Sequence, residues 1–175
     1  APPEVVGVTS RRLMRKGVAG PDADGRRQRV LSVRKDDGTA VVGERETGRL
    51  LQVFPDRSPA RELMTVGGID TTGNGGLLGL AISPTFTEDG LFYAYVSTAT
   101  DNRVVRFPMG GTPNPVLTGI PRGETHNGGG LVFAPDGTLF VGTGDTGTPA
   151  LAQDPASLAG KVLRVDVFGQ PVGPS

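Results

Sequence analysis

The sequence repeats itself at a spacing of about 50 residues, and this period constrains the fold more than any other feature of the chain. Three acidic turns end in glycine at Gly38, Gly90 and Gly137, which are 52 and 47 residues apart. Each unit then contains a turn residue followed by a cation and apolar residues, in the stretches Gly48-Arg49-Leu50-Leu51, Asn102-Arg103-Val104-Val105 and Gly160-Lys161-Val162-Leu163. A unit of four short strands that recurs at this period is typical of a β-propeller blade.

The spacing of apolar clusters also indicates short strands. Clusters separated by turn residues recur at about 8 to 12 residues, and 28 glycines and 15 prolines leave little room for long helices. The stretch 91–96 is apolar at both odd and even positions, so both faces of this strand are expected to be covered. Residues 61–66 are predicted as an outer strand, although Ser58-Pro59 could begin a helix. We therefore predict an all-β fold, a β-propeller of four-stranded antiparallel blades.

The length of the chain accommodates only part of such a fold. Propellers usually close with about four to eight blades, whereas 175 residues supply about three. We expect one partial β-propeller over residues 1–175, with a basic segment and incomplete outer strands at 1–28. The blades are expected at 29–67 and 73–120, with an incomplete one at 126–170.

Composition excludes several classes of function. The chain has no cysteine and one histidine, which argues against a zinc site, so we predict no metal-ligating residue. No apolar run approaches the roughly 18 residues that span a membrane, and no signal peptide is recognisable. The net charge is zero, although the first 35 residues carry an excess of six positive charges. No aromatic residues are interleaved there to stack on bases, so we predict a solvated edge and no nucleic-acid partner.

Three polar residues in glycine-rich turns could carry chemistry. His126 directly precedes an inner strand, where propeller loops crowd around the central channel; the alternative is an ordinary polar loop residue. Asp145 could cap its own turn, or fix the tautomer of a nearby imidazole and make it a better general base. Asn74 is equally compatible with a turn residue and with an amide facing the channel.

The stretch 142–147 also has the form G-x-G-x-x-G, with Asp166 nineteen residues beyond it. This spacing imitates a dinucleotide-binding motif, which must open a helix. Pro149, Pro155 and Gly160 interrupt the connection that follows, so the sequence argues against this interpretation. A helix of three turns between Gly147 and Lys161 would favour it.

A family resemblance rests on motifs that occur in order between residues 70 and 166. They are Gly73-Asn74-Gly75-Gly76-Leu77-Leu78-Gly79-Leu80-Ala81-Ile82-Ser83-Pro84, Asn102-Arg103-Val104-Val105-Arg106-Phe107, His126-Asn127-Gly128-Gly129, Phe133-Ala134-Pro135-Asp136-Gly137, Gly142-Thr143-Gly144-Asp145 and Ser157-Leu158-Ala159-Gly160-Lys161-Val162-Leu163-Arg164. Together they resemble the soluble quinoprotein glucose/sorbosone dehydrogenases, also called aldose sugar dehydrogenases, and actinobacterial exported proteins of that family.

The resemblance implies a six-bladed propeller that carries pyrroloquinoline quinone (PQQ) and calcium in its central channel and oxidises the C1 hydroxyl of an aldose. His126 falls on the family's catalytic base, and Asp145 on the carboxylate that partners it. Asn74 falls where family members often carry Gln or Glu beside the quinone, so it is the predicted cofactor-binding residue. The resemblance also implies export to the periplasm, the cell envelope or the exterior.

The chain departs from the family pattern in two respects. The calcium-binding carbonyls and the cations that clamp the quinone fall beyond residue 175 in the family. The tryptophan-containing strand of the first blade is replaced by residues 28–33. We expect an N-terminal half that is inactive alone and that associates with the missing half or with a second copy of the chain. The competing hypothesis is a non-catalytic exported propeller that binds a ligand or serves the cell envelope; His126 with Asp145 favours the enzyme, and the altered first blade favours the binder.

Overall fold

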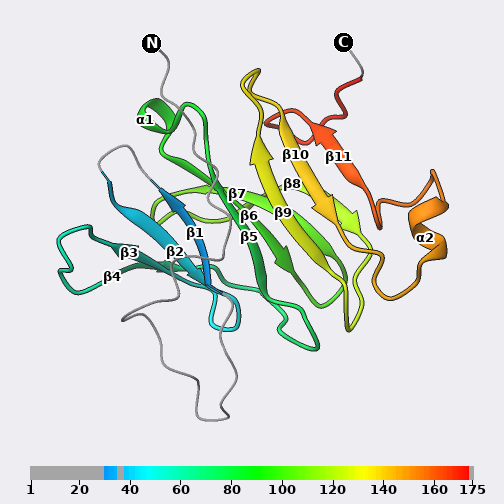
Figure 1. The fold of residues 1–175 in the computed structure, drawn as a ribbon, viewed down its shortest axis with the longest axis horizontal. Helices are drawn as coiled ribbons and strands as arrows, with labels where there is room; N and C mark the ends of the chain where they lie inside the picture. The colour runs from blue at the N-terminus through cyan, green and yellow to red at the C-terminus, as the bar shows by residue number, and fades with distance from the viewer. Residues whose placement is uncertain (1–29, 35–37, 174–175) are drawn as a thin grey trace.

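Three antiparallel sheets make up the computed structural model, which describes residues 30–34 and 38–173 (Figure 1). The first sheet contains β1 (Val30–Arg34), β2 (Ala40–Glu44), β3 (Arg49–Val53) and β4 (Arg61–Thr65). The second contains β5 (Leu77–Ile82), β6 (Leu91–Ser97), β7 (Asn102–Pro108) and β8 (Asn114–Ile120), and the third β9 (Gly128–Phe133), β10 (Leu139–Thr143) and β11 (Val162–Val165). Two four-residue helices, α1 (Phe86–Asp89) and α2 (Ala150–Gln153), lie in connections between strands.

The predicted all-β propeller fold is confirmed. In every sheet, strands that are consecutive in the sequence pair with one another. The repeated glycines Gly38, Gly90 and Gly137 each lie between the first and second strands of a sheet and have φ values of 79°, 61° and 82°. These left-handed conformations favour glycine over residues with a Cβ atom. The outer strand predicted at 61–66 is β4. The predicted basic segment at 1–28 lies outside the described residues.

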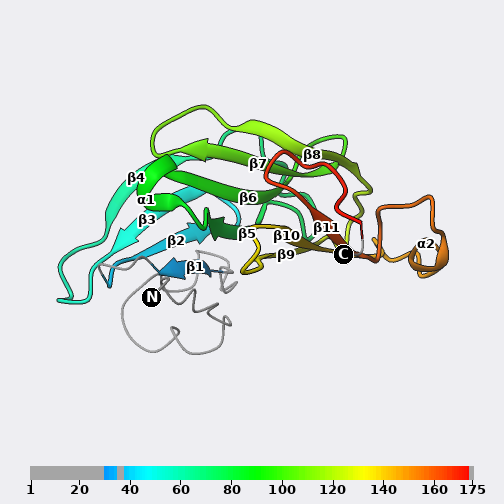
Figure 2. The same cartoon turned by 90° about the horizontal axis from the view of Figure 1, so that it is seen from above.

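The sheets pack face to face around two apolar cores. The first strands of neighbouring sheets lie side by side, β1 against β5 and β5 against β9 (Figure 2). On β6, Phe92 and Val96 pack toward the first sheet, whereas Tyr93 and Tyr95 pack toward the third. The central sheet therefore buries both of its faces, which explains why 91–96 is apolar at every position.

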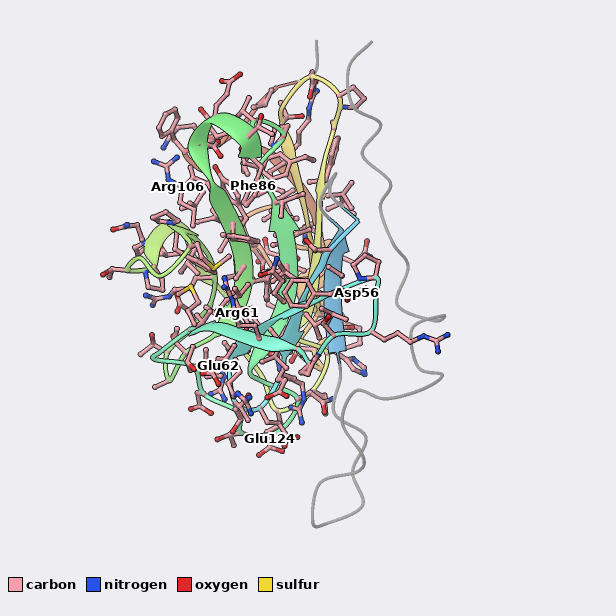
Figure 3. The ribbon with its side chains drawn as sticks, turned by 90° about the vertical axis from the view of Figure 1, so that its left-hand side faces the viewer. Asp56, Arg61, Glu62, Phe86, Arg106 and Glu124 are labelled. Atoms are coloured by element: carbon pink, nitrogen blue, oxygen red, sulfur yellow. The ribbon has the colours of Figure 1, made fainter. Side chains whose placement is uncertain are left out.

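The topology brings one set of connections to the same end of the sheets. In an antiparallel sheet with strands in sequence order, the start of the first strand and the end of the second strand lie at the same end of the sheet. The loops 66–76 and 121–127, which lead into β5 and β9, therefore lie at the same end of the sheets as the β2–β3 turn and the β10–β11 loop. We call this end of the molecule the site edge. Figure 3 shows Glu124 at this end and Phe86 and Arg106 at the opposite end.

No helix in the described part of the chain is long and apolar enough to cross a membrane.

We predict that Gly79→Ala strongly destabilises the fold. A Cβ atom at residue 79 would overlap the carbonyl oxygen of Gly129, so β5 and β9 could not keep their close approach. Overpacking between two backbones should cost about 3 kcal/mol of the free energy of unfolding, measured by chemical denaturation. Gly67→Ala is the matched control, since its Cβ would meet open space. Equal stability of the two variants would contradict the assigned packing of β5 on β9.

Candidate functional site

The histidine and the aspartate singled out from the sequence meet at the site edge. His126 Nδ1 lies 2.9 Å from Asp145 Oδ1, although the two residues come from different loops of the third sheet. The His126 side chain is 66% exposed and that of Asp145 26%, so the pair is open to a ligand on the imidazole side. Among the described residues Nδ1 is the ring nitrogen with a partner, which leaves Nε2 available.

The backbone holds the two loops against each other. His126 has φ 53°, a left-handed value that is uncommon for a residue with a side chain. Its carbonyl oxygen accepts a hydrogen bond from the Thr146 backbone N–H at 3.2 Å. A Cβ atom at residue 144 would overlap the same carbonyl, so Gly144 permits this approach.

Asp145 acts on its own turn as well as on the imidazole. The Gly147 N–H donates to Asp145 Oδ1 at 3.0 Å. This N–H first, and the His126 ring second, lower the pKa of Asp145 below its usual value of 3.8. Because an ionised carboxylate only accepts hydrogen bonds, Nδ1 of His126 must carry the proton in the contact. Asp145 therefore makes both of the contacts that the sequence left as alternatives: it caps its own turn, and it accepts a hydrogen bond from His126.

Asn74 lies in a neighbouring part of the site edge. Its backbone N–H donates to the Glu124 carbonyl oxygen at 2.7 Å, which ties its loop to the loop that carries His126. Asn74 is exposed and lines a polar hollow of about 600 Å³. The other lining residues are Arg45, Glu46, Thr71, Gly73, Glu124 and Thr125. His126 is not among them, although Glu124 and Thr125, which directly precede it, are.

Sequence reasoning missed two arginines of the site edge. Arg45 pairs with Glu46 and donates to the Gly75 carbonyl oxygen at 2.8 Å. Arg122 donates to Asp70 Oδ1 at 2.7 Å. Both guanidinium groups thus brace loops within the chain. No repeat or motif marks either arginine, because each also donates to an oxygen at least 28 residues away in the sequence.

The family resemblance implies two bound groups, calcium and PQQ, and the described residues do not suit them equally. Within residues 30–34 and 38–173, no group of three or more His, Asp or Glu side chains could hold a metal ion, so these side chains do not form a calcium site. The hollow offers hydrogen-bond donors for a polar quinone in the amide of Asn74 and the hydroxyls of Thr71 and Thr125, although the carboxylates of Glu46 and Glu124 also line it.

The dinucleotide alternative fails on structure. The stretch 142–147 does not open a long helix; α2 has four residues, and Asp154 follows it in an extended conformation. No helix N-terminus of the length that the motif requires is present at this loop.

These features define a partial β-propeller with an imidazole–carboxylate pair at the site edge of its third sheet. A family model described as Glucose / Sorbosone dehydrogenase matches residues 30–173. The chain belongs to this family.

Known relatives agree with this assignment. The PQQ-bound aldose sugar dehydrogenase of Streptomyces coelicolor is 39% identical, with a TM-score of 0.76, over 82% of this chain and 45% of that one. A structure described as a candidate oxidoreductase (glucose dehydrogenase) of Thermus thermophilus is 36% identical, with a TM-score of 0.74, over 82% and 45%. Quinoprotein glucose dehydrogenase B of Acinetobacter calcoaceticus is 28% identical over 76% of this chain and 36% of that protein. The chain thus spans less than half the length of these relatives.

We predict that Asp145 titrates below 3.8 and that His126→Gln moves its pKa part of the way back. The Gly147 N–H is the larger cause and remains in the variant, so the pKa stays depressed. Because the folded pKa is lowered, the stabilisation from this carboxylate is present above its unfolded pKa and is lost as the pH falls through the folded pKa. Carbon-13 NMR of the carboxyl groups measures the shift.

Asp136 is the internal control for this titration. Its pKa is lowered to about 2 by the Thr138 hydroxyl and N–H and by Arg164, none of which contacts His126. It should not respond to His126→Gln. An Asp145 pKa at or above 3.8 in the unsubstituted protein would contradict the predicted contact.

Proposed function

We propose that this chain forms the half of a quinoprotein aldose dehydrogenase that carries the catalytic base. The reaction is oxidation of the C1 hydroxyl of a sugar, with hydride transfer to PQQ. The observation that carries the proposal is the 2.9 Å contact between His126 Nδ1 and Asp145 Oδ1 on an exposed edge of the propeller. Membership of the Glucose / Sorbosone dehydrogenase family supports the class of reaction.

His126 removes the proton of the hydroxyl in this proposal. With Nδ1–H donated to Asp145, the lone pair of Nε2 points away from the carboxylate and can accept the sugar proton. The imidazolium that forms is then stabilised by the ionised Asp145. Such a positioned base contributes about 10² to 10⁴ in rate.

Asn74 contributes to the cofactor side of the site. PQQ, when bound, supplies the acceptor for the hydride. The amide of Asn74 and the hydroxyls of Thr71 and Thr125 would contact it through hydrogen bonds along the hollow. Among the described residues Arg45 and Arg122 are engaged with Glu46 and Asp70, and no three acidic or imidazole side chains gather, so we assign calcium binding and neutralisation of the quinone carboxylates to the remaining half of the propeller.

A non-catalytic exported propeller is the second candidate function. The observation in its favour is that the described residues offer no side-chain metal site and that Arg45 and Arg122 are already paired. Export is proposed for both candidates. A sugar is the proposed small-molecule partner of the enzyme, and the remaining half of the propeller or a second copy of this chain is the proposed protein partner.

We predict that His126→Gln in the native polypeptide, supplied with PQQ and calcium, lowers kcat for aldose oxidation by about 10² to 10⁴. Asp145→Asn should lower it less, since it leaves the base in place but weakens its orientation and the stabilisation of the imidazolium. Dye-linked turnover under steady-state conditions measures both variants. Glu88→Gln, at the opposite end of the second sheet, serves as the control and should leave kcat unchanged. Full turnover in His126→Gln would refute the role of His126 as the base, whereas no turnover in the unsubstituted polypeptide would favour the binding protein.

We predict that a chain limited to residues 1–175 does not oxidise sugars, even with PQQ and calcium added. The base accelerates the reaction only when the quinone and the sugar are held within reacting distance. Val132 and Val162 on the outer face of the third sheet are 60% and 75% exposed, so this chain should associate rather than remain a monomer. Dye-linked oxidation combined with light scattering tests both points. Quinone-dependent turnover by a monomer would overturn the prediction.

A further inference from the structure

A buried polar network connects the central sheet to the loop that carries His126. Asn127 follows the histidine directly and is 3% exposed. Its Oδ1 accepts hydrogen bonds from Asn102 Nδ2 at 2.9 Å and from the Gly123 N–H at 3.0 Å. Its Nδ2 donates to the Gly123 carbonyl oxygen at 2.8 Å. The side chain of Asn127 therefore closes the loop 123–127 upon itself and attaches it to the sheet.

Two further residues of the central sheet complete the attachment. The Tyr95 hydroxyl donates to the Asn127 carbonyl oxygen at 2.8 Å. Asn102 is fully buried, donates to the Pro121 carbonyl oxygen at 2.8 Å and accepts from the Ser97 hydroxyl at 2.6 Å. Burial raises the pKa of Tyr95 far above its usual value, so its hydroxyl keeps its proton and remains a donor.

The imidazole depends on its backbone for orientation. Two thirds of the His126 side chain is exposed, so packing holds the ring weakly, and Asp145 is its hydrogen-bond partner among the described residues. The residue is also held in the left-handed region, at φ 53°. Such a conformation persists only where the surroundings impose it. The bonds of Asn127 impose it on one side, and the Thr146 N–H on the other.

We propose that Tyr95 and Asn102 are positioning residues for His126, acting through Asn127 across the junction between the second and third sheets. The catalytic part of this inference rests on the proposed function, whereas the orientation of the imidazole does not. In this proposal the central sheet fixes the direction in which the base points, although neither His126 nor Asp145 belongs to that sheet.

Tyr93 provides a matched comparison with Tyr95. Both tyrosines lie on β6, both are almost completely buried against the third sheet, and both hydroxyls donate to a backbone carbonyl oxygen. The acceptor of Tyr93 is Val167, beyond β11, at 3.4 Å, and that of Tyr95 is Asn127 at the shorter distance of 2.8 Å. Replacement of either tyrosine by phenylalanine removes one hydroxyl and retains the ring, so the two variants differ in the loop that loses a bond and in the length of that bond.

The test compares Tyr95→Phe with Tyr93→Phe in the native polypeptide by nitrogen-15 NMR of the imidazole. His126→Gln assigns the signals. The unsubstituted protein should show a protonated Nδ1 and an unprotonated Nε2. In Tyr95→Phe the two nitrogen signals should move toward the tautomer mixture of a free histidine, whereas Tyr93→Phe should match the unsubstituted protein. Equal effects of the two variants, or no effect of Tyr95→Phe, would overturn the proposal.

A kinetic measurement tests the catalytic part separately. With PQQ and calcium present, Tyr95→Phe should lower kcat about fivefold, the change that corresponds to one hydrogen bond, and leave KM unchanged. Asn102→Asp, which replaces the donor facing Asn127 Oδ1 by an acceptor, should have a larger effect; the tyrosine pair decides the question if this variant does not fold.

If His126→Gln leaves turnover intact, the proposed function fails and the NMR comparison still tests the positioning. If His126→Gln abolishes turnover while Tyr95→Phe changes neither kcat nor the imidazole signals, the positioning fails and the proposed function stands.

Discussion

Both faces of the central sheet are buried, and the arrangement of the rest of the chain depends on this burial. Phe92 and Phe107 form part of the core shared with the first sheet, and Tyr93 and Tyr95 part of the core shared with the third. Apolar area removed from water is the main favourable contribution to such stacking. Because strands in each sheet follow the sequence order, stacking also brings the same class of loops to one edge. The site is a consequence of that alignment.

Neighbouring loops at the site edge approach one another so closely that their backbones are in contact. Gly73 lies against the Glu124 carbonyl and Gly144 against the His126 carbonyl, at separations that exclude a Cβ atom. Glycine is required at these positions for space, in addition to any freedom of φ. Polar side chains then attach the loops to one another and to the sheets, as Asn127 does for residues 123–127. The abundance of glycine thus reflects the way loops are packed as much as the number of turns.

The sequence allowed the fold to be predicted because its signals are local and periodic. The turn glycines, the doubly apolar stretch 91–96 and the outer strand near residue 61 need no knowledge of distant contacts. The site was predictable only in part, since the contact of His126 with Asp145 depends on the course of two loops. Tyr95 carries no sequence signal for its role, because an aromatic residue in an apolar run is indistinguishable from ordinary core. Its bond to Asn127 spans 32 residues and two sheets.

His126 and Asp145 belong to the loops of a single sheet, whereas the polar hollow is lined by loops that belong to all three sheets. His126 precedes β9 and Asp145 follows β10, so the dyad is internal to one repeat unit. Arg45 and Asn74 come from the loops of the first unit and of its junction with the second. A change of twist between the first two repeats would therefore reshape the hollow without separating the dyad. In evolutionary terms, the contact between His126 and Asp145 depends on one repeat unit alone, so substitutions at Arg45 or Asn74 can alter the hollow while this contact is retained.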